Sequence, residues 1–396
     1  MRRLVDEHRA VTRRFFSGLG AAGVAAWNAL PARAGDQATD PLLARAASQL
    51  EFLTPLDRIQ LGGRGNPSPH TLSPEEFRAA GLTPETWFLE VSPELESKPA
   101  PDVTRPLTRA LGTALDWRSL MKLAEKHAVR YPYVCSCTNV ADPFHTCLWE
   151  GVPLREVIWM TGLKANVRRV YYWGYTTPKS ERFQSSLPLD RILEEAPGEL
   201  PVMLAYKMNE QWISGPLGGP VRLIAPGFYA NRSIKWLQHM VLTNDYRAND
   251  SYAGANNDID SRLKTHARFL EHPATVPAHT PCAITGFAQV GISGLRQVQY
   301  SVFPAGEAGG EWRPATILPA PRTWGGGVSD PAAIRPQSWP MRYAIAHWAA
   351  VLPGLNPGKY TLCCRTIDEN GIAQPMPRPL PKTGMNAIQR VGLVVT

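Results

Sequence analysis

Apolar and polar positions alternate along several short stretches of this chain of 396 residues, as they do in strands with one buried face. Residues 129–135 alternate in this way, and residues 154–158 then place apolar side chains at helical spacing directly after a proline. The same two patterns predict strands at 87–91, 167–173, 202–206 and 221–225, and helices at 117–126 and 186–193. Short strands mixed with short helices in this order predict an α+β fold rather than a regular βαβ repeat.

The pattern changes after residue 265. Residues 266–281 are rich in proline and histidine, and we expect a linker there. Beyond it, alternation predicts strands at 283–288, 297–303, 343–348 and 359–365, joined by segments that carry glycine and proline. These strands predict a β-sandwich. The predicted organisation is therefore a mixed α/β domain over residues 35–265 and a β-sandwich domain over residues 266–396.

The first 34 residues have the features of an export signal. Arg13 and Arg14 form a twin-arginine pattern, and a weakly hydrophobic run rich in glycine and alanine follows over residues 17–30. Small residues at 32 and 34, on either side of Arg33, then suit a signal peptidase. The twin-arginine route exports folded proteins, so we expect a periplasmic protein that acquires any cofactor before export. The alternative for residues 1–34 is an amphipathic first helix of the domain.

The charge and the cysteine content narrow the function classes. The formal net charge is +8, but lysine and arginine are scattered without a long block, which favours a basic globular protein over a nucleic-acid-binding one. A modest positive field can still attract an anionic substrate. No apolar run long enough for a membrane span follows the N-terminal region, so we expect none in the mature protein. Six cysteines in a chain of this length do not indicate a disulfide scaffold.

Three of the six cysteines lie between the strand predicted at 129–135 and the helix predicted from residue 154. Loops held between rigid elements often carry functional residues, and thiols are soft ligands that suit a soft metal centre. A zinc site is an alternative on ligand type, although the spacing matches no common zinc pattern. Its ligands would be Cys135, Cys137, His145 and Cys147. No GxGxxG sequence follows a predicted strand, so a dinucleotide-binding fold is not indicated.

Several phrases of the sequence occur together in the order of one known family. They are Phe52–Pro55 with Arg64–Asn66, Cys135–Asn139 with Trp149–Leu154, Leu204–Asn209, and Gly219–Arg222 with Arg232–Leu237. On these phrases the chain resembles the sulfite oxidase family of molybdopterin-dependent oxidoreductases along most of its length beyond the predicted signal. The second domain is similar to the immunoglobulin-like dimerisation domain of that family, on the phrases Ile284–Ala288, Val298–Val302 and Arg365–Asp368.

The resemblance implies a mononuclear molybdenum bound by one molybdopterin dithiolene and one cysteine thiolate. Cys137 is the expected metal ligand and catalytic cysteine, with Cys135 as the alternative ligand, because the family places an asparagine shortly after its cysteine. Tyr252 resembles a catalytic tyrosine that lies near the metal and assists proton and electron transfer. The planar guanidinium group of arginine, the ammonium group of lysine and hydroxyl groups can donate hydrogen bonds to phosphate oxygens. The residues expected to bind the cofactor are Arg64, Asn66, Asn139, Arg222, Arg232, Ser233 and Lys235.

The implied activity is oxygen-atom transfer, with sulfite oxidation as the expected reaction and a homodimer as the expected assembly. No Cys-x-x-Cys-His haem-attachment sequence occurs, so electrons would pass to a separate protein such as a c-type cytochrome or a membrane haem subunit. A sulfoxide reductase is the alternative, because no arginine closely follows Cys137 and Asp142 adds a negative charge that disfavours an oxyanion. Arg322 or Arg365 would compensate for that charge. A second alternative is an exported, non-catalytic β-sandwich protein that binds a partner.

Overall fold

The computed structural model describes residues 41–48, 50–330, 334 and 338–396. The signal peptide predicted over residues 1–34 therefore lies outside the described residues. The chain forms two compact units, Met1–Ala44 and Arg45–Thr396. Of the first unit, the structure describes the start of helix α2 (Pro41–Ala47), and every other described element belongs to the second unit.

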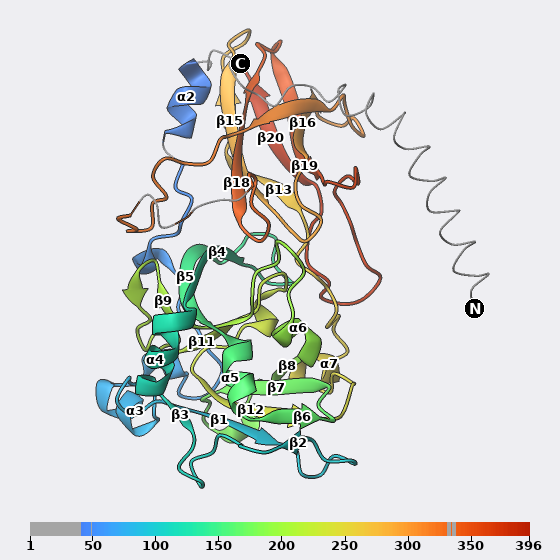
Figure 1. The fold of residues 1–396 in the computed structure, drawn as a ribbon. Coiled ribbons are helices and arrows are strands. Elements are labelled where there is room, and N and C mark those ends of the chain that lie inside the picture. The colour runs from blue at the N-terminus through green and yellow to red at the C-terminus, as the bar shows by residue number, and fades with distance from the viewer. Residues whose placement is uncertain (1–40, 49, 331–333, 335–337) are drawn as a thin grey trace, which may run out of the picture. The chain divides into compact units, whose positions relative to one another are not determined.

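Two sheets and a short ribbon form the part of the second unit that precedes residue 265 (Figure 1). One sheet has the order β3-β1-β12-β7-β8, with β1 parallel to β12 and the other pairs antiparallel. The other has the antiparallel order β10-β9-β5-β4, and β11 also pairs with β9. The ribbon joins β2 to β6. The bounds are β1 Phe88–Pro93, β2 Asp102–Val103, β3 Leu115–Asp116, β4 Val129–Cys135, β5 His145–Pro153, β6 Leu163–Ala165, β7 Arg169–Gly174, β8 Ser185–Pro188, β9 Met203–Met208, β10 Gln211–Trp212, β11 Arg222–Ile224 and β12 Leu237–Thr243.

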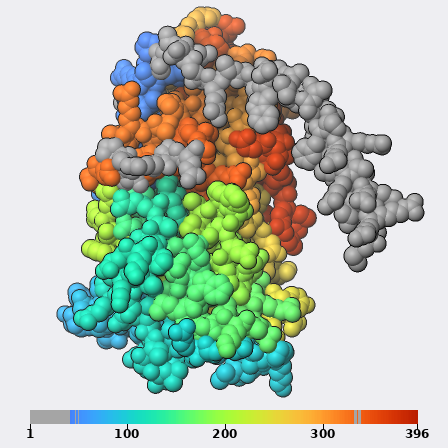
Figure 2. Space-filling view, viewed as in Figure 1, coloured from blue at the N-terminus to red at the C-terminus, as the bar shows by residue number. Residues whose placement is uncertain are grey.

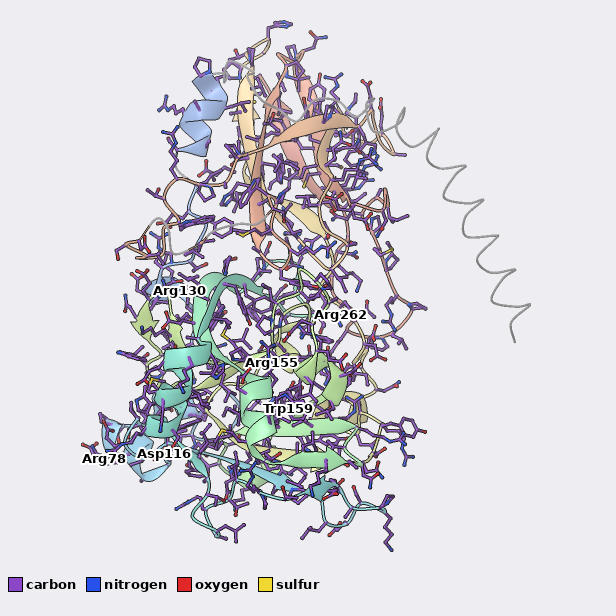
Figure 3. All side chains as sticks on the ribbon, viewed as in Figure 1. Arg78, Asp116, Arg130, Arg155, Trp159 and Arg262 are labelled. Atoms are coloured by element: carbon purple, nitrogen blue, oxygen red, sulfur yellow. The ribbon has the colours of Figure 1, made fainter. Side chains whose placement is uncertain are left out.

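Short helices connect these strands. The α-helices are α3 (Pro74–Ala79), α4 (Trp117–His127), α5 (Leu154–Met160), α6 (Leu189–Leu193) and α7 (Ser251–Gly254), and the 3-10 helices are η1 (Leu56–Arg58), η2 (Pro69–Thr71), η3 (Lys179–Glu181) and η4 (Ala230–Arg232). Asp116 caps the N-terminus of helix α4 (Figure 3), and its carboxylate accepts a hydrogen bond of 2.8 Å from the backbone N–H of Ser119. Such a cap satisfies a backbone donor that has no partner within the helix. Among the described residues, no helix combines the length and the apolar character that crossing a membrane requires.

The chain beyond residue 265 forms one eight-stranded sheet with the order β13-β15-β18-β17-β16-β19-β20-β14. Its strands are β13 His266–Glu271, β14 Thr275–Val276, β15 Cys282–Gln289, β16 Gln297–Pro304, β17 Arg313–Ile317, β18 Ile345–Leu352, β19 Gly358–Ile367 and β20 Gln389–Val395. Buried apolar side chains of β15 and β18 pack with those of β16, β19 and β20 in one cluster. The sheet therefore curls around a core of its own.

Mixed sheets with short helices, followed by a β-rich part, confirm the predicted α+β class. Two local predictions are wrong. The helix predicted from residue 186 begins only at Leu189, because residues 185–188 pair with β7 as a strand. The predicted linker begins with strand β13, which pairs with β15 and buries His266. The boundary at residues 265 and 266 and the immunoglobulin-like topology stay predictions.

One apolar core joins residues from both sides of position 265. It includes Phe52, Tyr133, Trp149, Trp324 and Tyr343. The backbone N–H of Val134 on β4 donates a hydrogen bond of 2.8 Å to the carbonyl of Tyr343. Strand β4, which leads into the cysteine-rich loop, is thereby fixed against the β-rich part of the chain.

Candidate active site

A cavity of about 330 Å³ opens where the loop after β4, the segment before β12 and helix α7 meet. Six of the ten residues predicted from the sequence line it. They are Arg64, Cys137, Asn139, Ser233, Lys235 and Tyr252. Lys382 adds a third cationic side chain, and no carboxylate belongs to the lining in the described part of the chain. The cavity is therefore positively charged, and we refer to it as the active-site cavity.

The three cysteines of the loop differ in where their sulfur atoms lie. Cys135 ends β4 and Cys147 lies on β5, so both are buried, and burial raises the pKa of both thiols. Cys137 follows the strand end, is only half buried and lines the active-site cavity. Its thiol donates a hydrogen bond of 2.6 Å to Asn139 Oδ1. Among these three, Cys137 is the cysteine whose side chain faces the cavity.

Two cations, the buried Arg222 and the half-buried Lys235, lie near one another at this site. Lys235 donates a hydrogen bond of 2.7 Å to the Gly62 carbonyl, and burial together with the charge of Arg222 lowers the pKa of its ammonium group to about 8. Arg222 lies over the ring of Trp149 at 4.7 Å and donates to the Leu217 carbonyl at 3.1 Å. Burial lowers the pKa of its guanidinium as well. Neighbouring desolvated cations without a carboxylate are costly, so the region is suited to an anion.

Several buried polar atoms of this region have no hydrogen-bond partner among the described residues. They are Arg222 Nε, Ser136 Oγ, Trp149 Nε1 and both ring nitrogens of His145. Burial, and then the charge of Arg222, lowers the pKa of His145 well below its ordinary value, so its ring is neutral. Buried polar atoms of native proteins normally have partners. These groups therefore offer hydrogen-bonding capacity to a bound group with polar atoms.

Tyr252 reaches the active-site cavity from α7, whose first turn is capped by the Asp250 carboxylate. Its hydroxyl is hydrogen-bonded to Thr138 Oγ1 and donates to the backbone carbonyl of Lys382 at 3.3 Å. Burial raises the pKa of the phenol, the Thr138 hydroxyl opposes that rise, and the nearby Cys137 thiol adds to it. The phenol is therefore protonated at neutral pH and able to donate a hydrogen bond.

Lys382 was not predicted from the sequence. It belongs to the connection between β19 and β20, which leaves the eight-stranded sheet in Figure 1 and lies at the surface in Figure 2. The connection is anchored by a hydrogen bond of 3.1 Å from Gly384 N to the Thr138 carbonyl, and by one of 3.2 Å from Asp258 N to the Pro381 carbonyl. No periodic pattern surrounds Lys382, so only the folded chain reveals its position.

Four predicted residues lie outside the lining of the active-site cavity: Cys135, Arg222, Asn66 and Arg232. The buried guanidinium of Arg232 forms an ion pair of 2.5 Å with Asp250 and also donates to backbone carbonyls. Asn66 is exposed, and its backbone N–H donates to the Thr177 carbonyl at 2.9 Å. The cofactor contacts of these residues stay predictions.

The negative charge of Asp142 is compensated, but not by the residues expected from the sequence. Asp142 lies outside the lining of the active-site cavity and forms an ion pair of 2.5 Å with Arg268 of β13. Arg365 lies instead over the ring of Trp312 at 4.2 Å, and Arg322 is not part of the lining. The zinc alternative is wrong for the part of the chain described, because no group of three or more His, Cys, Asp or Glu residues there is arranged to hold a metal ion.

The family model for an oxidoreductase molybdopterin-binding domain matches residues 83–251. An NADH nitrate reductase of Volvox carteri is 30% identical over 105 residues, which are 25% of this chain and 12% of that protein. An NADPH nitrate reductase of Beauveria bassiana is 33% identical over 100 residues, which are 25% of this chain and 11% of that protein. The match thus spans a small part of the length of these relatives.

Among solved structures, the sulfane dehydrogenase SoxCD from Paracoccus pantotrophus is similar over 92% of this chain and 93% of that chain, with a TM-score of 0.58 and 18% identity. This likeness extends over both the mixed part and the eight-stranded sheet, and it shows a shared fold. The matched molybdopterin-binding domain contains the active-site residues from Cys137 to Lys235. Residues 83–251 therefore match the molybdopterin-binding domain of oxidoreductases, which supports a molybdopterin-dependent oxidoreductase of the sulfite oxidase type with molybdenum–molybdopterin as its cofactor.

Proposed function

We propose that this chain oxidises sulfite in the active-site cavity and passes the electrons to a separate protein. The charge of the cavity carries the proposal, since Arg64, Lys235 and Lys382 line it without a carboxylate among the described residues. A small oxyanion gains electrostatic free energy in such a site, whereas a neutral sulfoxide gains much less. The ion pair between Asp142 and Arg268 removes the main argument for sulfoxide reduction.

The residues present fit the cofactor. Arg222 is a buried cation and Lys235 is a half-buried one beside it, which suits the phosphate group of molybdopterin. The unpartnered Arg222 Nε and Ser136 Oγ offer hydrogen bonds to polar atoms of the same group. Cys137 faces the active-site cavity, so we assign it as the metal ligand and keep Cys135 as the alternative. When bound, the cofactor supplies oxygen-atom transfer and takes up two electrons.

The other residues of the active-site cavity position the substrate and hold a proton. Lys382 and Arg64 bind the oxyanion through charge-assisted hydrogen bonds, which also orient it. Tyr252 keeps its proton at neutral pH and, on substrate binding, exchanges its 3.3 Å hydrogen bond to the Lys382 carbonyl for one to a substrate or product oxygen. Thr138 fixes the direction of that hydroxyl from the side. The β19–β20 connection is anchored beside the site by backbone hydrogen bonds, which hold Lys382 in the cavity lining.

The proposal includes the cellular setting. The twin-arginine pattern at Arg13 and Arg14 supports folded export to the periplasm, and the resemblance supports a homodimer formed through residues 266–396. The absence of a haem-attachment sequence supports an electron acceptor on another chain. Cell fractionation with Arg13→Lys/Arg14→Lys, and the mass of the purified protein in solution, test the first two points.

Metal content and substrate kinetics test the reaction. Protein exported from a molybdenum-replete host is expected to hold about one molybdenum per chain, by analogy with a single cysteine-ligated centre. We expect Cys137→Ser to alter the molybdenum spectrum and Cys135→Ser to preserve it. Sulfite oxidation should exceed the reduction of a sulfoxide or of nitrate. Protein without molybdenum, or faster reduction of either alternative substrate, would contradict the proposal.

Lys382→Met tests the role of the cavity charge. Because a charge-assisted hydrogen bond contributes roughly 1.5–3 kcal/mol, we expect the KM for sulfite to rise about tenfold or more. Lys359→Met is the matched control, because this exposed lysine lies on β19 away from the active-site cavity. An unchanged KM in Lys382→Met, or an equal change in the control, would show that Lys382 does not bind the substrate.

A further inference from the structure

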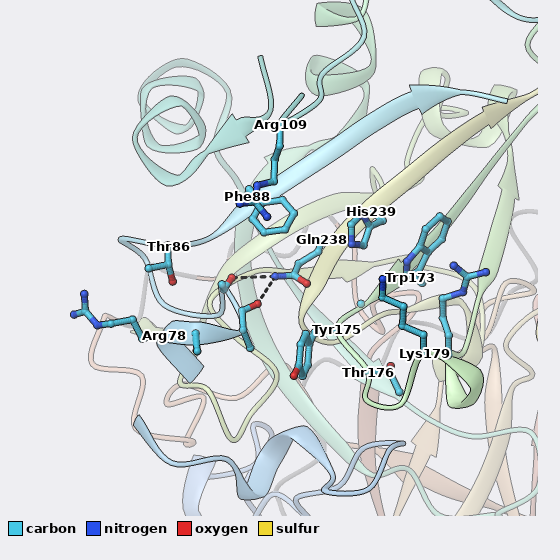
Figure 4. Close-up of a pocket in the computed structure, with 15 residues that line it drawn as sticks. Arg78, Thr86, Phe88, Arg109, Trp173, Tyr175, Thr176, Lys179, Gln238 and His239 are labelled. Carbon is cyan, nitrogen blue, oxygen red and sulfur yellow. Dashed lines mark hydrogen bonds between the residues drawn. The ribbon is translucent and has the colours of Figure 1, made fainter. Parts of the chain in front are cut away.

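A larger cavity, of about 650 Å³ (Figure 4), shares lining residues with the active-site cavity. Gly174, Tyr175 and Thr176, at the end of β7, line both cavities and form a common wall. The other walls of the larger cavity come from the end of α3, the start of β1 and strand β12. Neither the reaction proposed above nor a motif in the sequence gives this second cavity a role.

Cations and aromatic rings follow one another along the second cavity (Figure 4). Arg109 lies over the ring of Phe88 at 4.5 Å, and that ring meets His239 edge-on at 5.9 Å. The imidazole stacks on Trp173 at 5.3 Å, and Arg182 lies 4.4 Å from the centre of the same indole ring system. Stacking holds each guanidinium in place while its N–H edge still points away from the ring. The cavity is therefore preorganised to bind carboxylates or other oxyanions.

The second cavity is also strongly basic. Its cationic lining residues are Arg78, Arg109, Lys179 and Arg182, and no lining residue is a carboxylate. None of these four forms a salt bridge with another described residue. The nearby carboxylate of Glu90 is already engaged, by His239 at 3.3 Å and by the backbone N–H of Arg109 at 2.8 Å. An anionic partner would relieve the mutual repulsion of these cations.

The exposure of these cations favours a protein surface over a small ion as the partner. All four side chains are exposed to solvent, whereas selective sites for small ligands bury most of the ligand's surface. Exposed cations that surround a hollow attract an oppositely charged partner over a distance and orient its approach. The common wall at Gly174–Thr176 would then bring that partner next to the active-site cavity.

We propose that the second cavity is the docking site for the acidic face of a small electron-acceptor protein. This inference rests on the proposed function, because oxidation must deliver electrons to an acceptor. Conversion of one sulfite to sulfate takes one oxygen from water and releases two protons and two electrons. Two acceptor molecules dock in succession, and each takes one of the electrons.

The test uses the molybdenum-loaded chain with two protein acceptors of opposite charge, an acidic blue-copper protein and a basic c-type cytochrome. Benzoquinone serves as a neutral acceptor. Arg109→Glu/Lys179→Glu replaces two of the four lining cations with carboxylates and so cancels the net positive charge of the second cavity. Lys122→Glu/Lys164→Glu makes the same change in net charge at exposed positions on α4 and β6, and is the matched control. Binding of the acidic protein is measured separately, without turnover, by NMR line broadening.

We expect the cavity variant to lower kcat/KM for the acidic acceptor by about tenfold or more at low ionic strength, and to weaken its binding in parallel. The rate with benzoquinone should not change, and added salt should reduce the difference between parent and variant. Arg182→Gln, which removes one charge without reversing it, should give a smaller effect in the same direction. This single variant replaces the double variant in the test if the double variant does not fold.

Equal effects of the two double variants, or a preference of the parent chain for the basic cytochrome, would overturn the proposal. A lower rate with benzoquinone together with lost molybdenum would also overturn it, since the cavity would then support the cofactor. Binding without turnover separates the two proposals. Docking can be confirmed if sulfite is the wrong substrate, and docking can fail while sulfite oxidation with benzoquinone succeeds.

Discussion

Replacing Lys235 with methionine separates the effect of this charge on folding stability from its proposed role in binding the cofactor. In the folded chain the pKa of this ammonium group falls from 10.5 to about 8, chiefly because it is buried and then because Arg222 is close. Since one pKa unit corresponds to about 1.4 kcal/mol, the buried charge destabilises the cofactor-free fold by roughly 3 kcal/mol near neutral pH. Methionine keeps an apolar stem but loses the hydrogen bond to Gly62. We therefore expect Lys235→Met to stabilise the cofactor-free chain by about 1–3 kcal/mol.

The pH dependence identifies the cause of that gain. Between pH 8 and pH 10.5 the unfolded chain still holds the Lys235 proton while the folded chain has released it, so the stability of the parent rises with pH in this window. Methionine does not titrate, so the advantage of Lys235→Met should shrink towards zero near the upper end. Urea unfolding of cofactor-free protein at about pH 7 and about pH 10 measures both values. A variant less stable than the parent at neutral pH, or a gain independent of pH, would refute the reasoning.

Three further changes test single contacts. Tyr252→Phe removes a hydroxyl with two hydrogen bonds, so we expect kcat to fall about 100-fold with molybdenum retained; an unchanged kcat would exclude a role in proton transfer. Gly174→Ala would place a methyl group 2.0 Å from a backbone oxygen and should lower the unfolding free energy by several kcal/mol, whereas Gly254→Ala, with nothing within 4 Å, should change it by less than about 1 kcal/mol. Asp250→Asn leaves the buried Arg232 without its carboxylate, so urea unfolding should show a loss of roughly 3–5 kcal/mol, and an unchanged midpoint would contradict this.

Local patterns were sufficient to predict the elements on either side of the cysteine-rich loop. Alternation over residues 129–135 predicted a strand, and β4 has those bounds. The apolar spacing after Pro153 predicted a helix, and α5 begins at Leu154. Helix α5 buries one face, so the spacing of its apolar residues reports its geometry directly. Strand β4 is instead buried on both faces from Tyr131 onward, so the alternation indicated its extended backbone but not its burial.

The same patterns fail where pairing with a distant segment decides the structure. Residues 185–188 are a strand because β7 offers its edge, and β13 forms because β15 does. Cofactor phrases were likewise a partial guide. They predicted Lys235 and Ser233, which line the active-site cavity. They did not reveal that Arg232 forms an ion pair with Asp250. Hydrogen-bond partners far along the chain leave no periodic signal for sequence reasoning to detect.

The charge of the active-site cavity shows why the substrate class depends on the fold. Along the chain, Cys137 is followed by Asp142 with no arginine nearby, and that order favoured a neutral substrate. In the structure Asp142 is paired with Arg268, while Lys382 arrives from the β19–β20 connection. Because electrostatic energy depends on distance in space and on burial rather than on separation in sequence, these two long-range contacts decide which charges act at the active-site cavity. The proposed preference for an oxyanion therefore rests on the eight-stranded part of the chain as much as on the cysteine-rich loop.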